Sequence, residues 1–238
     1  FPSKTVHYTK TFQIEDPMQV CYLEFEGVYM NAAVYVNGAL AGQHINGYTP
    51  FTIDISPYLH AGENEVKVLV RNGVSSSRWY TGTGIYRNVH LLRAGRLHIA
   101  PNGVRISTQQ AEPDLAVLVI ETILENRNDT VCDTVLRHHI GNVEVSAPVT
   151  MLPRETKSVT LRMELEHPKL WSVDTPNLYT CETELAGIDQ ASTRFGVRTL
   201  CLDSRHGLRI NGETVKLRGG CIHHDFGVVG AADNRALE

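Results

Sequence analysis

The chain has 238 residues, of which 42% are apolar and 20% are charged, and its formal net charge is −4. This length allows one or two domains with a buried core. The charge gives no reason to expect nucleic acid or an anionic membrane as a partner, and no apolar run is long enough to span a bilayer. The five cysteines are scattered and form no Cys-x-x-Cys pair, which argues against a disulfide framework and a thiolate zinc site.

Both ends of the sequence look like cut points. The chain begins "FPSKTVHYTKTFQI", without Met or a charged-then-apolar leader, and it ends "AADNRALE", which is typical of a helix start with no stop signal. We therefore expect a piece of a longer protein. The compartment stays open, with the bacterial cytoplasm or periplasm as the expectation.

Residues 1–95 are expected to form an antiparallel β-sandwich of the jelly-roll type. Short β-rich runs alternate apolar and other side chains and are separated by turn residues; they include "VCYLEFEGV", "AAVYVNG", "TPFTIDI" and "NEVKVLVRN". Asn-Gly pairs beginning at Asn37, Asn46 and Asn72 predict tight hairpin turns. "SPYLHAGEN" predicts one short helical turn, with Ser56 as its cap and Gly62 as its stop.

Residues 96–200 are expected to form an immunoglobulin-like sandwich without its disulfide. About seven short strands with Asn, Asp, Pro and Gly between them fit that fold; those we place are "VRISTQ", "LAVLVIETILEN", "VCDTVLRHHI", "ETKSVTLRMEL", "LYTCETEL" and "STRFGVRTL". The Pro-rich stretch "HPKLWSVDTPNLY" predicts a long ordered connection, with Trp171 and Tyr179 packing it against the sandwich.

Residues 201–238 change in character. "GLRINGETVKLRGGCIHHD" predicts a hairpin that turns at Asn211-Gly212, and its second arm is apolar enough for a buried strand. A loop with Gly227 and Gly230 then leads into the helix-like tail. A strand, a loop and a helix start make the first unit of an α/β fold, which needs neighbouring strands to cover it.

The consecutive residues His223, His224 and Asp225 are the first candidate site. In a strand their side chains alternate between faces, so only His223 and Asp225 can point together. Two ligands are too few for zinc, which disfavours a metal site. Two readings stay open: core histidines satisfied by hydrogen bonds, or one wall of a substrate pocket at the C-terminal end of an α/β strand.

The second candidate site is the stretch from Ser75 to Arg87, "SSSRWYTGTGIYR". Its hydroxyls and Arg78 can bond sugar hydroxyls, and its aromatic rings can stack on an apolar sugar face. Alternatively, Trp79 and Tyr80 simply close the sandwich. No pair of carboxylates suggests acid/base work, because the glutamates in strand patterns should face solvent; these are Glu24, Glu26, Glu121, Glu125, Glu182 and Glu184.

Taken together, several stretches resemble glycoside hydrolase family two, and most closely its β-galactosidases. "YTKTF", "LEFEGVYMNAAVYVNGALAGQHINGYTPFTIDIS" and "GTGIYRNVHLL" are similar to the sugar-binding jelly roll of that family. "PKLWSVDTPNLY" and "TRFGVRTL" resemble the end of its immunoglobulin-like domain. "GLRINGETVKLRGGCIHHDFGVVGAA" is similar to the start of its catalytic eight-stranded barrel, with Leu217 to His223 as the first strand.

The resemblance implies a retaining glycosidase that cleaves terminal β-D-galactosides, with two glutamates on later barrel strands, so no catalytic residue lies in this chain. It implies that His223 and Asp225, with His224 beside them, line the sugar pocket. Arg78 falls where relatives acting on galactose or glucuronate often have an aspartate that reaches the sugar. That departure leaves the role of Arg78 open, although arginine can donate to hydroxyls or to a carboxylate.

The resemblance also indicates which substrate and cofactors to expect. It implies a β-galactoside or oligosaccharide substrate for the full-length enzyme and leaves a homo-oligomer open, while the charge and the lack of a long apolar run give no nucleic acid and no membrane as partners. It implies no cofactor in this part of the chain and leaves Mg²⁺ or Na⁺ open for the full enzyme. Three alternatives remain: a stand-alone carbohydrate-binding or adhesion module, a β-glucuronidase of the same family, and a purely structural fragment whose sandwiches only buttress a barrel and pair subunits.

Overall fold

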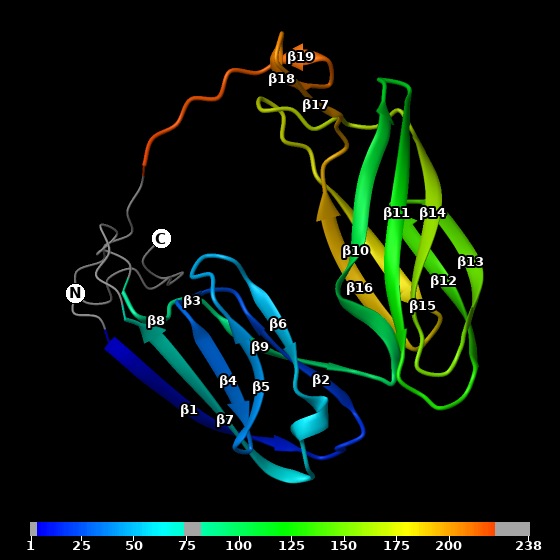
Figure 1. Cartoon of the computed structure of the whole chain (residues 1–238). Helices are drawn as coiled ribbons and strands as arrows, with labels where there is room; N and C mark the ends of the chain where they lie inside the picture. Colours follow the sequence, from blue (N-terminus) through cyan, green and yellow to red (C-terminus); the bar gives the residue numbers. More distant parts are fainter. Residues whose placement is uncertain (1–3, 74–81, 222–238) are drawn as a thin grey trace. The chain divides into compact units, whose positions relative to one another are not determined.

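The computed structural model describes residues 4–73 and 82–221. The chain divides into two compact units, each built of antiparallel strands (Figure 1): the first contains the N-terminal part up to Ala94, and the second runs from Gly95 to Gly219. The prediction of a mainly-β chain is confirmed. All five cysteines are free thiols. Among the described residues, no helix has the length and apolarity needed to cross a membrane.

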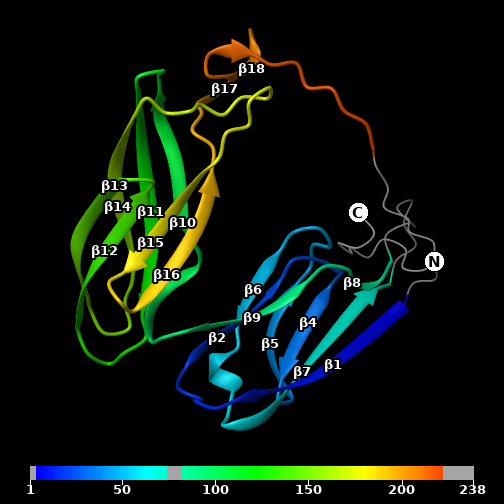
Figure 2. The same ribbon diagram turned by 180° about the vertical axis from the view of Figure 1, so that it is seen from behind.

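Two sheets form the layers of the first unit (Figure 2), with a two-stranded sheet beside them. Their strand orders are β1-β7-β4-β5, β6-β2-β9 and β3-β8. The elements are β1 (Lys4–Ile14), β2 (Val20–Phe25), β3 (Val28–Tyr29), β4 (Ala32–Val36), β5 (Ala39–His44), β6 (Phe51–Asp54), a 3₁₀ turn η1 (Ser56–Tyr58), β7 (Gly62–Asn72), β8 (Gly84–Ile85) and β9 (Val89–Ala94).

The core of this unit follows from the period-two alternation of its strands. Alternate residues of β4, β7 and β2 meet between the two main sheets, among them Val34, Val70 and Phe25, each at most 1% exposed. The rings of Phe25 and Phe51 stack with their centroids 4.7 Å apart. The intervening residues of these strands face away from this core, so each main sheet also has an outer face.

The Asn-Gly predictions for this unit have different outcomes. Asn37 and Gly38 have φ angles of 49° and 84° and connect the paired strands β4 and β5, so this hairpin turn is confirmed. The hairpin at Asn46-Gly47 is wrong, because β5 and β6 belong to different sheets. There the Asn46 side chain instead accepts hydrogen bonds from the backbone N–H groups of Tyr48 and Thr49. Asn72-Gly73 ends at the edge of the described residues.

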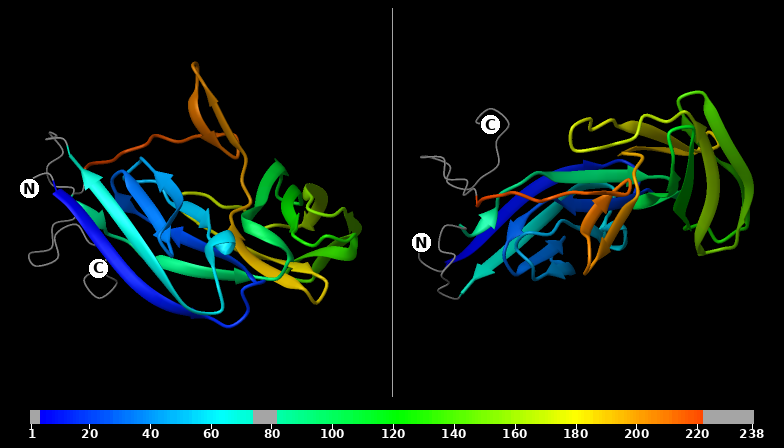
Figure 3. Two further views of the ribbon diagram at one scale, coloured as in Figure 1. Left: turned by 60° about the horizontal axis from the view of Figure 1, so that its bottom comes forward. Right: turned by 90° about the horizontal axis from the view of Figure 1, so that it is seen from above.

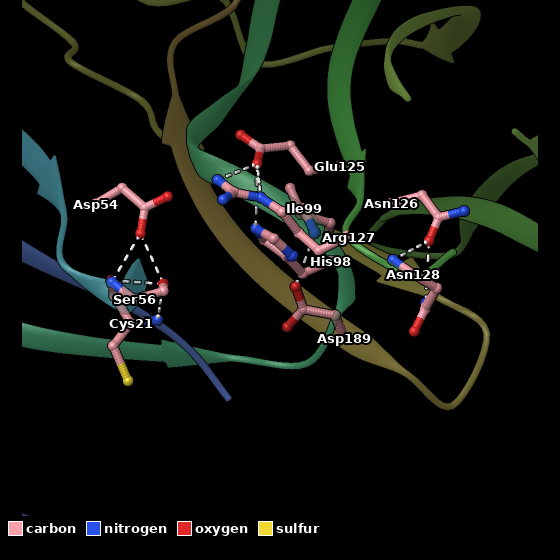
Figure 4. Close-up of polar contacts among 10 residues, drawn as sticks. All are labelled: Cys21, Asp54, Ser56, His98, Ile99, Glu125, Asn126, Arg127, Asn128 and Asp189. Atoms are coloured by element: carbon pink, nitrogen blue, oxygen red, sulfur yellow. Dashed lines mark hydrogen bonds and ion pairs between the residues drawn. The ribbon is translucent and has the colours of Figure 1, made fainter. Parts of the chain in front are cut away.

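The short helical turn is confirmed as η1, but Ser56 is not its cap. The N-cap position is Ile55, which has no side-chain capping bond. Ser56 instead links strands: its backbone N–H and its hydroxyl donate to Asp54 Oδ1 at 2.9 and 2.6 Å, and its Oγ accepts from the N–H of Cys21 at 2.9 Å (Figure 4). Gly62, with φ of 93°, begins β7, as a stop residue after a turn should.

The second unit is a seven-stranded sandwich of two antiparallel sheets, β10-β11-β14 and β13-β12-β15-β16, as expected for an immunoglobulin-like domain. Its buried side chains lie between the sheets, among them Leu118, Leu124, Leu136 and Leu185. The strands are β10 (Leu97–Ala111), β11 (Leu115–Asn126), β12 (Cys132–Ile140), β13 (Val143–Met151), β14 (Thr156–Glu166), β15 (Tyr179–Leu185) and β16 (Asp189–Phe195).

A fully buried histidine joins the two sheets of this sandwich. His138 on β12 lies with its Nδ1 3.0 Å from Thr183 Oγ1 and its Nε2 3.4 Å from Thr122 Oγ1. Thr183 is on β15 of the same sheet, whereas Thr122 is on β11 of the opposite sheet. Burial lowers the pKa of His138 to about 4, so the imidazole is neutral at pH 7.

The sequence did not predict one strand of the sandwich, β13. It contains Pro148, which an edge strand tolerates because the edge needs no donor on its outer side.

The predicted connection between β14 and β15 is ordered as expected. The N–H of Trp171 donates to Val197 O at 2.9 Å, and the N–H of Lys169 donates to Tyr179 Oη at 2.7 Å.

A small three-stranded sheet follows, with β17 (Leu200–Asp203), β18 (Gly207–Ile210) and β19 (Glu213–Thr214), and it projects beyond the two large sheets of its own unit (Figure 3). The turn at Asn211-Gly212 is confirmed, with φ angles of 51° and 83°. The buried strand predicted next is wrong over its described part: residues 215–221 are not in a strand, and Leu217 is 80% exposed. A strand needs a ladder partner, and apart from the bond from the N–H of Val215 to Leu208 O, at 2.8 Å, no described strand pairs with this segment.

Candidate functional site

The four sugar-contacting residues predicted from the sequence are Arg78, His223, His224 and Asp225. All four lie outside the described residues. The described part of the second candidate stretch is Gly82–Arg87, which contains β8. The structure therefore describes the residues on either side of the segment 74–81.

Both ends of that segment are fixed by one short stretch, Tyr29–Asn31. On the returning side, Tyr29 pairs with Gly84 where β3 meets β8. On the departing side, the N–H of Arg71 donates to Met30 O at 3.1 Å and to Asn31 O at 3.3 Å, and Asn31 Nδ2 donates to Arg71 O at 3.1 Å. The Tyr29–Met30 peptide bond is cis, and Asn31 has a φ of 50°. The two ends of the segment are thus tied to the same piece of backbone.

Three further tyrosines, Tyr8, Tyr48 and Tyr86, make contacts at this anchor and at the residues next to it. The N–H of Ile85 donates to Tyr8 Oη at 3.3 Å, and Tyr86 Oη donates to Gly47 O at 2.8 Å. The rings of Tyr29 and Tyr48 meet edge to face, with centroids 5.4 Å apart. Burial raises the pKa of the Tyr86 phenol, which keeps the hydroxyl protonated and able to donate. These rings and bonds hold the described backbone on both sides of residues 74–81.

Three glycines allow the tyrosines to pack this closely. A Cβ added at Gly27 would lie 2.6 Å from the ring of Tyr86, one at Gly47 would lie 2.2 Å from the ring of Tyr29, and one at Gly84 would lie 2.2 Å from Tyr8 Oη. Gly84 also has a φ of 145°. Sequence reasoning missed this set, because each glycine and its tyrosine are far apart in the chain; the available signal was the repeated Gly-Tyr neighbourhood in "INGY" and "GTGIY".

Gly47→Ala is expected to destabilise the first unit by about 1–3 kcal/mol, as overpacking a core does. The new methyl group would clash with the Tyr29 ring, which is 7% exposed and has little room to move. Urea unfolding of the chain measures the change. Gly73→Ala is the matched control, since a Cβ there meets nothing within 4 Å. Equal effects of the two substitutions would contradict the packing role of Gly47.

Several carboxylates of the described residues take part in ion pairs and hydrogen bonds. Glu26 Oε1 lies 2.9 Å from His90 Nε2, and this contact is the main cause that lowers the pKa of Glu26. Glu125 does not face solvent as expected: it is 19% exposed, because it lies opposite His98 in the strand register and bonds Arg127 at 2.7 Å (Figure 4). Among residues 4–73 and 82–221 no cluster of three or more ligating side chains could hold a metal ion.

Comparison with protein families assigns most of the chain. Residues 2–95 match the sugar-binding domain of glycosyl hydrolases family 2, and residues 97–198 match a second domain of the same family. The chain is 38% identical, over 97% of its length, to the β-galactosidase BoGH2A of Bacteroides ovatus, and it is 29% identical, over 90% of its length, to a β-glucuronidase of Formosa agariphila. It spans 29% and 25% of the lengths of these two relatives.

Solved structures agree with this assignment. A family 2 member from Bacteroides cellulosilyticus superposes with a TM-score of 0.87 at 34% identity, covering 95% of this chain and 33% of that one. A β-glucuronidase from Bacteroides uniformis superposes with a TM-score of 0.85 at 25% identity, covering 99% of this chain and 31% of that one. The chain therefore belongs to glycosyl hydrolase family 2.

Proposed function

We propose that this chain is the non-catalytic front part of a retaining glycosidase that cleaves terminal β-D-galactosides. The observation that carries the proposal is the 38% identity to a β-galactosidase across 97% of the chain. The family match to a sugar-binding domain over residues 2–95 supports it. Because the chain spans under a third of that relative, the activity is proposed for the full-length protein and not for these residues alone.

We assign three parts to the chain within this proposal: a jelly roll over residues 1–95, an immunoglobulin-like sandwich over residues 96–200, and the start of a catalytic barrel over residues 201–238. A retaining glycosidase needs two carboxyl groups about 5–5.5 Å apart across the scissile bond. We expect both to lie on later barrel strands, so that this chain contributes walls of the pocket and not the reacting groups.

Four residues are proposed to touch the sugar. His223 and Asp225 are proposed to form one wall of the pocket, with His224 beside them, because in the barrel strand expected there alternation would put the first two on one face. Arg78 belongs to the segment whose two ends are held by Tyr29–Asn31. The bonds that hold Arg71 and Gly84 on either side of that segment support a binding role, since a side chain that positions a substrate must itself be held in place.

A β-glucuronidase is the second candidate. The Formosa relative and the Bacteroides uniformis structure both carry that name. Arg78 also suits a uronic acid, because a guanidinium binds a carboxylate with two parallel hydrogen bonds. Relatives named β-glucuronidase or putative β-glucuronidase are 29% to 34% identical to the chain, against 38% for the β-galactosidase, which makes this the second choice.

The test is to assay the full-length parent on the 4-nitrophenyl β-glycosides of galactose and glucuronic acid, and to identify by NMR the anomer released first. We expect hydrolysis of the galactoside with retention, and no hydrolysis by the 238-residue chain. Preferential cleavage of the glucuronide would select the second candidate. A parent that cleaves neither glycoside, together with tight calorimetric binding of galactose or lactose by this chain, would favour a binding module instead.

A further inference from the structure

The outer face of the sheet β1-β7-β4-β5 contains a cavity of about 260 Å³. Its walls include Asn31, Ala33, Tyr35, Gln43, Leu69 and Arg71. The strand register explains its position, because Ala33 lies directly beside Leu69 on β7 and Gln43 on β5, while its neighbours Ala32 and Val34 belong to the core on the other face. A small residue among larger neighbours leaves the hollow, and Ala33, 8% exposed, forms its floor.

His44 also lines the cavity, with its Nε2 2.9 Å from Thr49 Oγ1, and the other charged and amide side chains of the wall are available to a ligand. Within residues 4–73 and 82–221, the guanidinium of Arg71 has no ion-pair partner and the side-chain amide of Gln43 has no hydrogen bond. Asn31 uses Nδ2 to bond Arg71 O, at 3.1 Å, and its Oδ1 accepts no bond from these residues. No aspartate or glutamate is among the described residues that line the cavity. The site therefore offers one unpaired positive charge, amide donors and an acceptor.

The apolar walls complement these groups. Leu69 and Tyr35 are both half-buried on the sheet face, and Ile45, which is 73% exposed, also lines the cavity. Lys67 lies two residues from Leu69 on the same face of β7 and pairs in register with Tyr35, which adds positive charge beside the cavity. A pyranose ring has an apolar face and polar edges, so it can contact such walls and bond the amides at the same time.

We infer that this cavity binds a carboxylate-bearing pyranose, that is, a uronic acid residue of a glycan. In this inference the Arg71 guanidinium takes the carboxylate with its paired donors, Gln43 and Asn31 bond ring hydroxyls, and Leu69 and Tyr35 contact the ring. The volume fits one sugar unit, because it lies slightly below the roughly 300 Å³ at which pockets for larger ligands begin. The inference does not depend on the reaction proposed above for the full-length enzyme.

Calorimetric titration of the 238-residue chain with methyl β-D-glucuronide, methyl β-D-galacturonide and methyl β-D-galactoside tests the inference. We expect the uronides to bind in the millimolar range and the neutral galactoside to bind about tenfold more weakly or not at all. Two variants locate the site: Arg71→Gln removes the charge, and Ala33→Leu fills the cavity. Each is expected to weaken uronide binding by about tenfold or more. Lys67→Gln, on the same strand and face but outside the cavity wall, is expected to change it by less than about threefold.

The outcomes separate clearly. Circular dichroism melting first establishes that the variants are folded, and Arg71→Lys, which keeps the charge without the planar fork, is expected to bind at an intermediate strength. Equal binding of uronide and galactoside, or uronide binding that survives Arg71→Gln, would overturn the inference. Absence of binding by the unmodified chain would overturn it as well. None of these outcomes affects hydrolysis of a nitrophenyl galactoside by the parent, so the two proposals fail independently.

Discussion

The folded chain is expected to lose about 3 kcal/mol of its unfolding free energy as the pH falls from about 6.5 to about 4. The cause is His138, which is 0% exposed and whose pKa is lowered to about 4 from an ordinary value of 6.5. Between pH 6.5 and pH 4 the His138 imidazole is mostly protonated in the unfolded chain and mostly neutral in the folded chain. The contribution of His138 to stability is therefore fully present above about pH 6.5 and declines as the pH falls toward the pKa of the folded state.

Other titratable groups also contribute to the pH dependence of stability. Burial also lowers the pKa of His98, so this residue acts in the same direction as His138. The lowered carboxyl pKa values of Glu26 and Asp203 start from 4.5 and 3.8, so their contributions are lost mainly at lower pH than that of His138. The window between about pH 6.5 and 4.5 therefore reports on the buried imidazoles.

Urea unfolding at several pH values measures this effect, with His138→Gln as the variant. This substitution keeps a polar side chain near Thr122 and Thr183 but cannot titrate, so the slope of unfolding free energy against pH should decrease by up to about 1.4 kcal/mol per unit. His139→Gln is the control, because His139 is the next residue on β12 and is 41% exposed beside Glu144. Its charge adds to burial in lowering the pKa of His138, so a smaller decrease in slope is expected for the control. An unchanged slope in His138→Gln, or the same decrease in the control, would contradict the assignment.

In the full-length enzyme, His223→Ala is expected to lower kcat/KM by about 10²-fold, in the range of removing one donor aimed at the reacting sugar. The proposed contact with substrate predicts a large loss of rate with little change in melting temperature. Steady-state kinetics on the nitrophenyl galactoside and a thermal melt measure both quantities.

The matched control is His206→Ala, in the turn between β17 and β18. His206 is 48% exposed and pairs with Asp203 at 3.2 Å, so its removal should leave the rate unchanged. If His223→Ala lowers the melting temperature and leaves kcat/KM intact, His223 is a core histidine. That result would return it to the first of the two readings that the sequence left open.

Local signals in the sequence predicted local structure well. The turns at Asn37-Gly38 and Asn211-Gly212 follow from two residues whose backbones accept positive φ. The same dipeptide at Asn46-Gly47 gives a different structure, because there the glycine is required by the Tyr29 ring and the strands on either side join different sheets. Whether β13 lies at a sheet edge is likewise a property of the whole sandwich, so Pro148 could not be interpreted from its neighbours alone.

The candidate site was less predictable. Motifs located the segment containing Arg78 and the residues around His223, which lie outside the described residues, but not the tyrosines that support the first of these. Tyr8 and Ile85 bond across 77 positions, and Tyr86 and Gly47 bond across 39. Such contacts depend on sheet order, and no short stretch of sequence encodes it. The cavity beside Arg71 depends in the same way on Ala33 lying between Leu69 and Gln43.

The anchoring of one connection at both ends has a consequence for how such enzymes diverge. Since Tyr29–Asn31 holds the backbone at Arg71 and at Gly84, the fold places little demand on the number of residues inserted between them. Doubling the length of a flexible connection costs only about 0.6 kcal/mol in closure entropy. Insertions and deletions at this point should therefore be accepted readily during evolution. The same position is therefore a natural place to graft the corresponding connection from another family member.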